Sequence, residues 1–338
     1  MKAPRLGRRT ALGLGIGLIA GTSARAQASW KPSRPINLIV PWAAGGSTDQ
    51  VTRVVAGELE AALGQTVVII NQPGASGAIG TKSCLDAARD GYTWTSGAVQ
   101  DLGAYQTLGT VNASIKDWNL FLSVANVPVL AVNANAPYKT AAEFIEGMKK
   151  RPGAITVATA GVTSAGHAAM DLVANATKAT YRHVTYDGGN PAVVATVAGE
   201  TVATSQVASD EAEMIRGKML RPLAAIGDRA VVLEGFGTIP PLSDTIPGFT
   251  APASYFGIFL PKGVPDEVLA TLTALWRDKI GSSEKLKAYA AKNGAVFAPA
   301  SGEQAQTLAF PAVQANAWQL FNSNKAKVSP ATVGIPAP

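Results

Sequence analysis

The sequence predicts an α/β protein of two lobes, each a mostly parallel sheet flanked by helices, with a ligand cleft between the lobes. Short apolar runs alternate with helical patterns along nearly the whole chain. Gly and Pro are spread throughout, which favours many turns and argues against a coiled coil. A length of 338 residues, 47% of them hydrophobic, is enough for about two domains with buried cores.

The first α/β unit begins soon after residue 29. Residues 36–40 are an apolar run that Pro41 stops, and a helical pattern over 48–63 follows, which Gly64 ends. We expect Ser47 or Thr48 to cap this helix, because a hydroxyl can accept from a first-turn amide. The unit continues with a strand at 67–70, a Gly-rich stretch at 71–80, a helix at 79–88 and a strand at 93–96. Parallel strands in this order place a ligand beyond their carboxyl ends.

The second unit starts near Pro128 and repeats the alternation. Thr140 is the expected cap of its first helix. Strands are expected at 129–132, 155–158, 181–186, 202–205 and 223–226, and helices at 141–150, 167–177, 192–198 and 211–217. Residues 235–253 are rich in Pro and Gly and are interpreted as a connection.

The last part of the chain is expected to return to the first lobe. Residues 254–260 are strand-like, Pro265 and Asp266 open a helix that reaches about residue 280, and two more helical segments follow. We therefore expect a first lobe made of residues 29–127 plus 254–338 and a second lobe made of residues 128–253. The two crossovers between them would act as a hinge.

The positive charge of the chain belongs to its N-terminus. Lys2, Arg5, Arg8, Arg9 and Arg25 supply five of the six net charges, so the remainder carries only +1. A nearly neutral remainder has no electrostatic footprint for nucleic acid. The basic stretch, a short apolar run over 10–21 and two A-x-A patterns predict that residues 1–28 are a cleavable secretory signal.

The apolar run is too short to span a bilayer, so a membrane anchor is the less favoured alternative. Arg8 and Arg9 loosely fit a twin-arginine signal, and ordinary Sec export stays open. There is no Cys near the cleavage region that a lipid anchor would need. We expect an exported protein with no stable membrane insertion.

The first candidate site is the loop after the first strand. A strand end, a glycine turn and a helix start bring free amide N–H groups to one point, which binds anions without a dedicated cation. No Gly-Lys-Ser/Thr follows the glycines, so this is not a P-loop, and a plain tight turn is the alternative. The residues are Trp42, Ala43, Ala44, Gly45, Gly46, Ser47 and Thr48.

The second candidate site repeats this logic in the other lobe. Two such loops facing each other can each take one carboxylate. A hydrogen bond to a charged group contributes about 1.5–3 kcal/mol, against roughly 0.3–1 kcal/mol for a charge at a helix start, so the hydrogen bonds matter more. The residues are Thr159, Ala160, Gly161, Thr163 and Ser164, with His167 just behind them.

Enzymatic chemistry is poorly supported. Ser164, His167 and Asp187 have the residue types of a hydrolase triad, but Ser164 is only three residues before His167 and no G-x-S-x-G elbow is present. A Ser near a helix start is more often a cap or an anion ligand. His167 is interpreted as a packing or hydrogen-bonding residue of its helix rather than a general base.

The sequence also gives no sign of a metal or cofactor. Its only Cys, Cys84, lies in an apolar helical pattern and is expected to be a buried thiol. With one Cys and two His, a zinc site of the usual Cys/His kind is excluded. The glycines of 74–80 have the wrong spacing for a dinucleotide loop. We expect no catalytic residue, metal or cofactor.

Taken together, these segments resemble the tripartite tricarboxylate transporter receptor family, also called Bug-type solute-binding proteins. The resemblance covers nearly the whole mature chain, and the ordered set is more specific than any one segment. It is carried by 34–49, 64–68, 71–77, 90–93, 160–167, 186–189 with Pro191 and Ala192, and 255–265.

The resemblance implies a type II-like periplasmic-binding-protein fold and a periplasmic receptor for a di-, tri- or aromatic carboxylate. Its partners would be integral-membrane transporter subunits or, alternatively, a membrane sensor kinase. We expect it to act as a monomer.

The resemblance also extends the candidate site. It implies a contribution from Ala98 and Val99 after the third strand, and a second-lobe wall formed by Tyr186, Asp187 and the segment around Ser205 and Gln206.

The chain departs from the family pattern at several of these positions. Trp42 replaces the usual Phe and offers a larger surface for an aromatic ligand. Ala43 and Ala44 replace prolines, and Asp187 replaces a frequent Lys. Gln206 falls where a carboxylate is expected, which would weaken the case for an amino-acid ligand. The alternative is that Gln206 is simply solvated.

Overall fold

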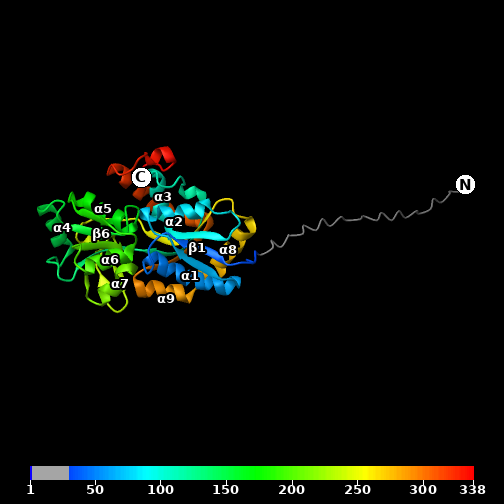
Figure 1. The fold of residues 1–338 in the computed structure, drawn as a ribbon, viewed down its shortest axis with the longest axis horizontal. Coiled ribbons are helices and arrows are strands. Elements are labelled where there is room, and N and C mark those ends of the chain that lie inside the picture. The colour runs from blue at the N-terminus through cyan, green and yellow to red at the C-terminus, as the bar shows by residue number, and fades with distance from the viewer. Residues whose placement is uncertain (2–29) are drawn as a thin grey trace.

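The computed structural model describes Met1 and residues 30–338, arranged as two sheets with helices packed around them (Figure 1). The predicted signal at 1–28 lies almost entirely outside the described residues. Along residues 30–338, no helix combines the length and apolar character needed to cross a membrane.

The first sheet contains six strands in the order β13-β4-β12-β3-β1-β2. Its segments come from both ends of the chain, and α1 and α9 lie side by side although they are far apart in sequence (Figure 1). The strands are β1 (Ile36–Val40), β2 (Val67–Asn71), β3 (Thr93–Ala98), β4 (Trp118–Asn126), β12 (Ser254–Pro261) and β13 (Val296–Ser301). The helices are α1 (Ser47–Leu63), α2 (Ala78–Asp86), α3 (Val99–Leu108), α8 (Asp266–Asp278), α9 (Glu284–Asn293) and α10 (Gly302–Asn322).

The second sheet contains five strands in the order β7-β6-β8-β5-β9. The strands are β5 (Pro128–Asn133), β6 (Thr156–Thr159), β7 (Arg182–Thr185), β8 (Ala203–Val207) and β9 (Leu220–Ala225). The helices are α4 (Ala141–Lys150), α5 (Ala165–Thr177), α6 (Gly189–Val197) and α7 (Ala208–Arg216). A small hairpin, β10 (Val231–Leu233) and β11 (Gly237–Ile239), partly occupies the segment interpreted as a connection.

The two sheets are mixed rather than mostly parallel, which corrects that detail of the predicted fold class. β1 pairs in parallel with β2 and β3, as the first unit predicts. β12 is antiparallel to both β3 and β4, because β4 carries the chain out toward the second sheet and β12 brings it back. In the second sheet, β5 is likewise antiparallel to β8 and β9.

The chain changes sheet at two places. Val127 alone separates β4 from β5, whereas the return from β9 to β12 runs through the hairpin β10–β11 and the segment that follows it.

Helix ends test the capping predictions. Thr140 caps α4 by accepting from the amide of Glu143, and Gly64 ends α1 in the left-handed conformation, as predicted. The cap predicted at Ser47 or Thr48 is wrong. Gly46 is the N-cap of α1, and the hydroxyl of Ser47 is bonded to Asp210 instead.

Burial explains why α3 was not predicted from the sequence. α3 is buried almost all round, so it has no polar stripe to mark it as an amphipathic helix.

The prediction of a buried thiol is confirmed for Cys84, where burial raises the pKa to about 12. Trp94 and Trp118 are among the largest fully buried side chains of the first lobe, and Phe144 and Met148 have that role in the second.

Candidate functional site

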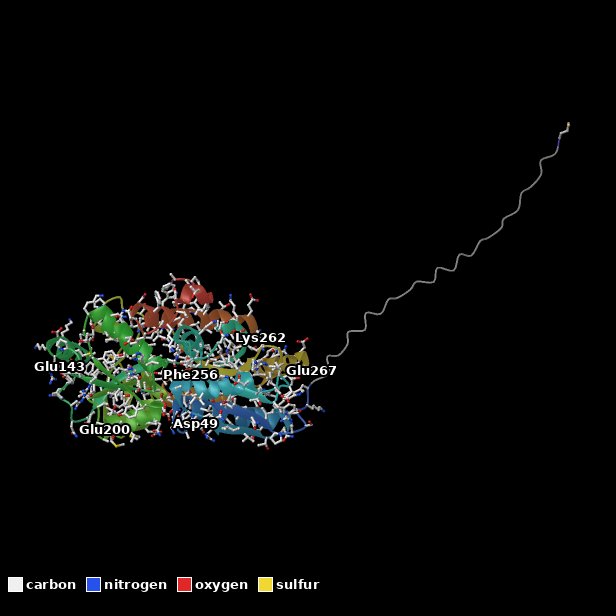
Figure 2. The ribbon with its side chains drawn as sticks, turned by 45° about the horizontal axis from the view of Figure 1, so that its top comes forward. Asp49, Glu143, Glu200, Phe256, Lys262 and Glu267 are labelled. Atoms are coloured by element: carbon white, nitrogen blue, oxygen red, sulfur yellow. The ribbon has the colours of Figure 1, made fainter. Side chains whose placement is uncertain are left out.

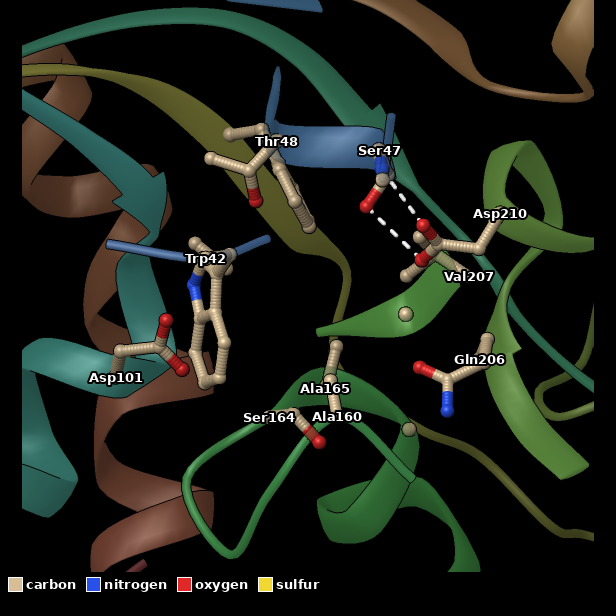
Figure 3. A pocket seen from close by; sticks show the side chains of 15 residues that line it. Trp42, Ser47, Thr48, Asp101, Ala160, Ser164, Ala165, Gln206, Val207 and Asp210 are labelled. Carbon is tan, nitrogen blue, oxygen red and sulfur yellow. Dashed lines mark hydrogen bonds between the residues drawn. The ribbon is translucent and has the colours of Figure 1, made fainter. Parts of the chain in front are cut away.

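A small cavity lies where the two lobes meet, with Phe256 of β12 at the centre of the molecule (Figure 2). Its volume is about 30 Å³, whereas ligand pockets usually measure about 300–1,000 Å³. The lobes are therefore closed on one another. The cavity is lined by Trp42, Gly46, Ser47, Thr48, Ala98, Asp101, Ala160, Ser164, Ala165, Gly166, Gly189, Gln206, Val207, Asp210 and Phe256 (Figure 3).

Both predicted loops reach this cavity, but only part of each loop lines it. Eight of the residues predicted for the site line the cavity: Trp42, Gly46, Ser47, Thr48, Ala98, Ala160, Ser164 and Gln206. The other predicted residues do not line it: Ala43, Ala44, Gly45, Val99, Thr159, Gly161, Thr163, His167, Tyr186 and Asp187.

Several residues outside the wall hold the lobes together instead of facing the cavity. The amide of Ala43 donates to the carbonyl of Asp187 at 3.0 Å. The amide of Val162 donates to the hydroxyl of Ser76 at 3.2 Å, and the hydroxyl of Thr163 donates to the Ser76 carbonyl at 3.0 Å. These bonds join the two lobes across the cleft.

The first-lobe wall is the start of α1. Strand β1 ends at Val40, and the chain turns so that Gly46 precedes the first helical residue. The amides of the first turn point out of the helix and have no partner within it. Ser47 and Thr48 are buried at this point and carry the hydroxyls that the sequence predicted there.

A carboxylate of the second lobe already occupies part of this helix start. Asp210 accepts from the Ser47 amide at 2.6 Å and from the Ser47 hydroxyl at 3.0 Å (Figure 3). Burial raises the pKa of Asp210 to about 6, and the two bonds from Ser47 oppose that rise. Asp210 keeps part of its surface accessible, so water still offsets some of the cost of its charge.

The second-lobe wall is the start of α5. Ser164 is the N-cap of this helix and accepts from the amide of His167 at 3.3 Å, while its hydroxyl donates to the carbonyl of Gly161 at 2.8 Å. Ala165 and Gly166 follow, and both line the cavity. Gly166 is required by close approach, since a Cβ there would lie 1.8 Å from the Ser205 carbonyl oxygen.

Two further polar groups face the cavity. Gln206 is 2% exposed, and its amide nitrogen donates to the Ala158 carbonyl while its oxygen points toward the cavity (Figure 3). The alternative that Gln206 is solvated is therefore wrong. Asp101 is 3% exposed. Burial raises the pKa of Asp101 well above its usual range, against the effect of nearby donors on Thr163, Ala98 and Trp42.

The sequence reasoning missed Asp101 and Asp210. Both lie in the first turn of the helix that follows a strand, α3 after β3 and α7 after β8. The rule that ligands bind beyond strand carboxyl ends applies to both positions. The sequence pattern did not predict α3, which carries Asp101. It placed the start of α7 at residue 211, three residues after its true start and just beyond Asp210.

Ser164, His167 and Asp187 do not come together as a hydrolase triad. The Ser164 hydroxyl donates to a carbonyl, and Asp187 is exposed on the loop between β7 and α6. The His167 imidazole lies within hydrogen-bond distance of Lys325 Nζ, at 2.9 Å, and of the Tyr181 hydroxyl, at 3.2 Å. Burial lowers the pKa of His167 to about 3, so the ring is neutral.

Within residues 30–338, no group of three or more His, Cys, Asp or Glu side chains is arranged to hold a metal ion. No Lys or Arg is present among the described residues that line the cavity. The wall presents hydrogen-bond donors, which are hydroxyls and first-turn amides, and hydrogen-bond acceptors, which are carboxyl and side-chain amide oxygens. Such a site can bind a small polar molecule and supplies no nucleophile and base in contact.

Two α/β lobes with a polar cavity at their junction are the architecture of a two-lobed solute-binding protein. The match of residues 51–321 to the model of the tripartite tricarboxylate transporter family receptor shows the family. The chain belongs to that family, whose members are periplasmic binding receptors and not enzymes.

Relatives and solved structures agree with this assignment. Protein BugT of Bordetella pertussis is 31% identical over 304 residues, covering 88% of this chain and 91% of BugT. The structure of periplasmic binding protein BugD matches with a TM-score of 0.79 at 24% identity, covering 87% and 99% of the two chains.

MatC from Rhodopseudomonas palustris, with bound malate, matches with a TM-score of 0.77 at 22% identity, covering 86% of this chain and 99% of MatC. These structures confirm the predicted fold class, that of two-lobed periplasmic binding proteins.

Proposed function

We propose that this chain is a periplasmic receptor that closes on a small organic carboxylate and presents it to the integral-membrane subunits of a tripartite tricarboxylate-type transporter. The observation that carries the proposal is that the starts of α1 and α5, one from each lobe, open into the same cavity. First-turn amides and hydroxyls at such a point bind a carboxylate. At about 1.5–3 kcal/mol each, several such bonds reach micromolar affinity, about −8 kcal/mol.

The start of α5 is the better place for the carboxylate of the ligand. At α1, the Ser47 amide and hydroxyl are already used by Asp210. At α5, the Ser164 hydroxyl donates its proton to Gly161, and the amides of Ala165 and Gly166 in the first turn are the donors left for a ligand; both residues line the cavity. A carboxylate there also gains from the positive end of the helix dipole.

Ligand entry requires the lobes to separate, because a cavity of about 30 Å³ is too small for an organic acid. The proposed rigid bodies are residues 29–127 plus 254–338 and residues 128–253, moving about Val127 and the link before Ser254. We further propose that residues 1–28 direct export and are removed, so that closure takes place in the periplasm.

A thermal-shift screen over mono-, di- and tricarboxylates, with the corresponding uncharged amides as controls, tests binding. A ligand at 100 times its Kd stabilises the protein by about 2.7 kcal/mol, which is a shift of several degrees. An acid should shift the melting temperature and its amide should not. If only sugars or inorganic cations shift it, the proposed ligand class is wrong.

Ser164→Ala and Thr140→Ala form a matched pair for locating the carboxylate. Both substitutions remove a helix N-cap, and each is expected to cost about 1 kcal/mol of stability. Ser164→Ala should also weaken binding of the acid about tenfold, because it changes the cavity wall, while Thr140→Ala should leave the affinity unchanged. Equal affinities in the two variants would place the carboxylate elsewhere.

The transport step is tested in the organism that carries the gene. Deleting the gene should abolish uptake of the acid that binds in the screen, and the intact gene should restore it. Normal uptake with loss of an acid-induced transcriptional response would contradict the transport role and favour presentation to a sensor kinase.

A further inference from the structure

Polar contacts between the lobes gather at the tip of the loop that precedes α5. This loop, residues 160–164, belongs to the second lobe and leads from β6 to α5. The Val162 amide donates to the Ser76 hydroxyl of the first lobe at 3.2 Å, and the Thr163 hydroxyl donates to the Ser76 carbonyl at 3.0 Å. The Thr163 carbonyl accepts from the side-chain amide of Asn316 at 3.0 Å. The tip is therefore bonded to two separate elements of the first lobe, the segment before α2 and the helix α10.

These contacts are buried, and they lie outside the cavity. Thr163 is 1% exposed and Asn316 is 3% exposed, and neither of them nor Ser76 lines the cavity. A buried hydrogen-bonding group that loses its partner is costly until water reaches it. The contacts therefore oppose separation of the lobes, whichever molecule the cavity holds.

The groups of the first lobe that receive the tip are held in place by their own lobe. The Asn316 side-chain amide also donates to the Gln100 carbonyl at 3.2 Å, which fixes its direction. Gly77, next to Ser76, is so closely packed that an added Cβ would lie 2.5 Å from the Tyr105 hydroxyl oxygen and 3.1 Å from the Trp42 ring. Because these groups are ordered before the tip arrives, little conformational freedom is lost when it binds.

The backbone at Ser76 is strained. Ala75 has φ 48° and Ser76 has φ 54°, so two consecutive residues with a Cβ adopt the left-handed conformation. Such strain persists where the surrounding structure holds it, and it is common in binding and switch segments. The opposing loop fits this conformation closely, since a Cβ added at Gly161 would lie 2.6 Å from the Ser76 hydroxyl oxygen.

We propose that Ser76 and Asn316 form a latch that captures Thr163 and keeps the lobes closed in the protein without a ligand, so that residues outside the cavity set the affinity. The inference rests on the proposed function, in which closure is the binding motion. The apparent affinity of a ligand scales with the population of the binding-competent form. The latch therefore changes the affinity for every acid by the same factor and does not select among acids.

Hydrogen exchange at the Val162 amide tests the latch without any ligand, because this amide donates to Ser76 across the lobes. In the wild type it should exchange at least about tenfold more slowly than an unprotected amide. Ser76→Ala should remove the protection. Ser83→Ala is the control, since that hydroxyl donates to the Ile79 carbonyl within α2, and it should change nothing at Val162. A wild-type Val162 amide that exchanges as an unprotected amide overturns the latch.

Asn316→Ala and Asn133→Ala separate the latch from a general loss of stability. The Asn133 side-chain amide also donates to two carbonyls, those of Thr196 and Val197, but within the second lobe. Both variants should lower the melting temperature by similar amounts. Only Asn316→Ala should speed exchange at Val162, by about three- to tenfold, and give a less compact molecule in small-angle scattering. Equal exchange at Val162 in the two variants contradicts the latch.

Calorimetry with malate, succinate and benzoate connects the latch to affinity. Ser76→Ala and Asn316→Ala should weaken every acid that binds the wild type by a common factor of about three to ten. Unchanged affinity, or weakening of one acid and not another, overturns the proposed role of the latch. Failure of all three acids to bind the wild type counts against the proposed function, whereas exchange at Val162 still decides whether the latch exists.

Discussion

Lys325 joins the C-terminal segment of the chain to the second lobe by contacting Asp171 of α5, with Nζ 2.8 Å from Oδ2. The same ammonium lies 2.9 Å from Nε2 of His167. Because Nε2 accepts from Lys325, the proton of the neutral ring is on Nδ1 and faces the Tyr181 hydroxyl, which donates to Asp171 at 2.6 Å. This cluster connects the lobes directly behind the start of α5.

The first prediction concerns this connection. Lys325→Met should leave Asp171 with one donor fewer and favour the open form. Because Lys325 is about one-third exposed, the expected loss is only about 1 kcal/mol of unfolding free energy and a few-fold loss of ligand affinity. Urea unfolding and calorimetry measure the two effects.

Lys292→Met is the control, since Lys292 pairs with Glu213 across the lobes at 3.8 Å and both side chains are exposed. It should change little. A loss of affinity in Lys292→Met equal to that in Lys325→Met would contradict a special role for the Lys325 cluster.

The second prediction concerns pH. The pKa of Asp210, raised to about 6, means that the folded protein binds this proton more tightly than the unfolded chain does. The stability contributed by the proton is present below about pH 4 and is lost as pH rises through 6. Asp210→Asn should therefore gain about 1–2 kcal/mol relative to wild type between pH 4 and pH 7.

The difference between the two proteins, followed by urea unfolding from pH 4 to pH 8, reports Asp210 together with the groups that its charge affects. These are Glu211 next to it on α7 and Tyr289 on α9, whose pKa values are raised by burial and also by the charge of Asp210. The lowered pKa values of His167 and His183, which act in the opposite direction, cancel in the difference. A difference that does not vary with pH would show that Asp210 titrates normally.

The third prediction concerns the packing of α5 on β8. Gly166→Ala should destabilise the protein by about 1–3 kcal/mol or more, because the new Cβ would meet the Ser205 carbonyl at 1.8 Å and the backbone must shift. Gly57→Ala within α1 meets nothing within 4 Å and should stabilise by up to about 1 kcal/mol. Thermal unfolding compares them, and similar melting temperatures would refute the close approach.

The fourth prediction concerns lobe closure. Gly46 has φ −78°, which any residue adopts, so Gly46→Val should fold normally. A Cβ there would lie 3.3 Å from Oδ1 of Asp210, and the larger side chain should hold the lobes apart and weaken binding at least tenfold. Small-angle scattering should show a less compact molecule. Gly57→Val is the control, and a compact Gly46→Val with wild-type affinity would contradict the prediction.

Local patterns in the chain were sufficient for most helices and strands. The sequence predicted the bounds of β1, α1, β5 and α4 almost to the residue. These elements have a clear hydrophobic period, and several of them end at a residue that stops or caps them, such as Pro41, Gly64 or Thr140. α3, β4 and β13 were not predicted. α3 is buried nearly all round and so lacks the periodicity on which the prediction depends.

The sequence by itself determined the α/β class, the strand-loop-helix segments and the two loops that reach the cavity, since these follow from short-range periodicity, turn chemistry and capping. Only the tertiary structure decided which residues face the cavity. Asp101 and Asp210 are 109 positions apart in the sequence and line the same cavity because the lobes close, which no local pattern encodes. The same closure placed Asp210 on the Ser47 amide, where the sequence predicted the anion of a ligand.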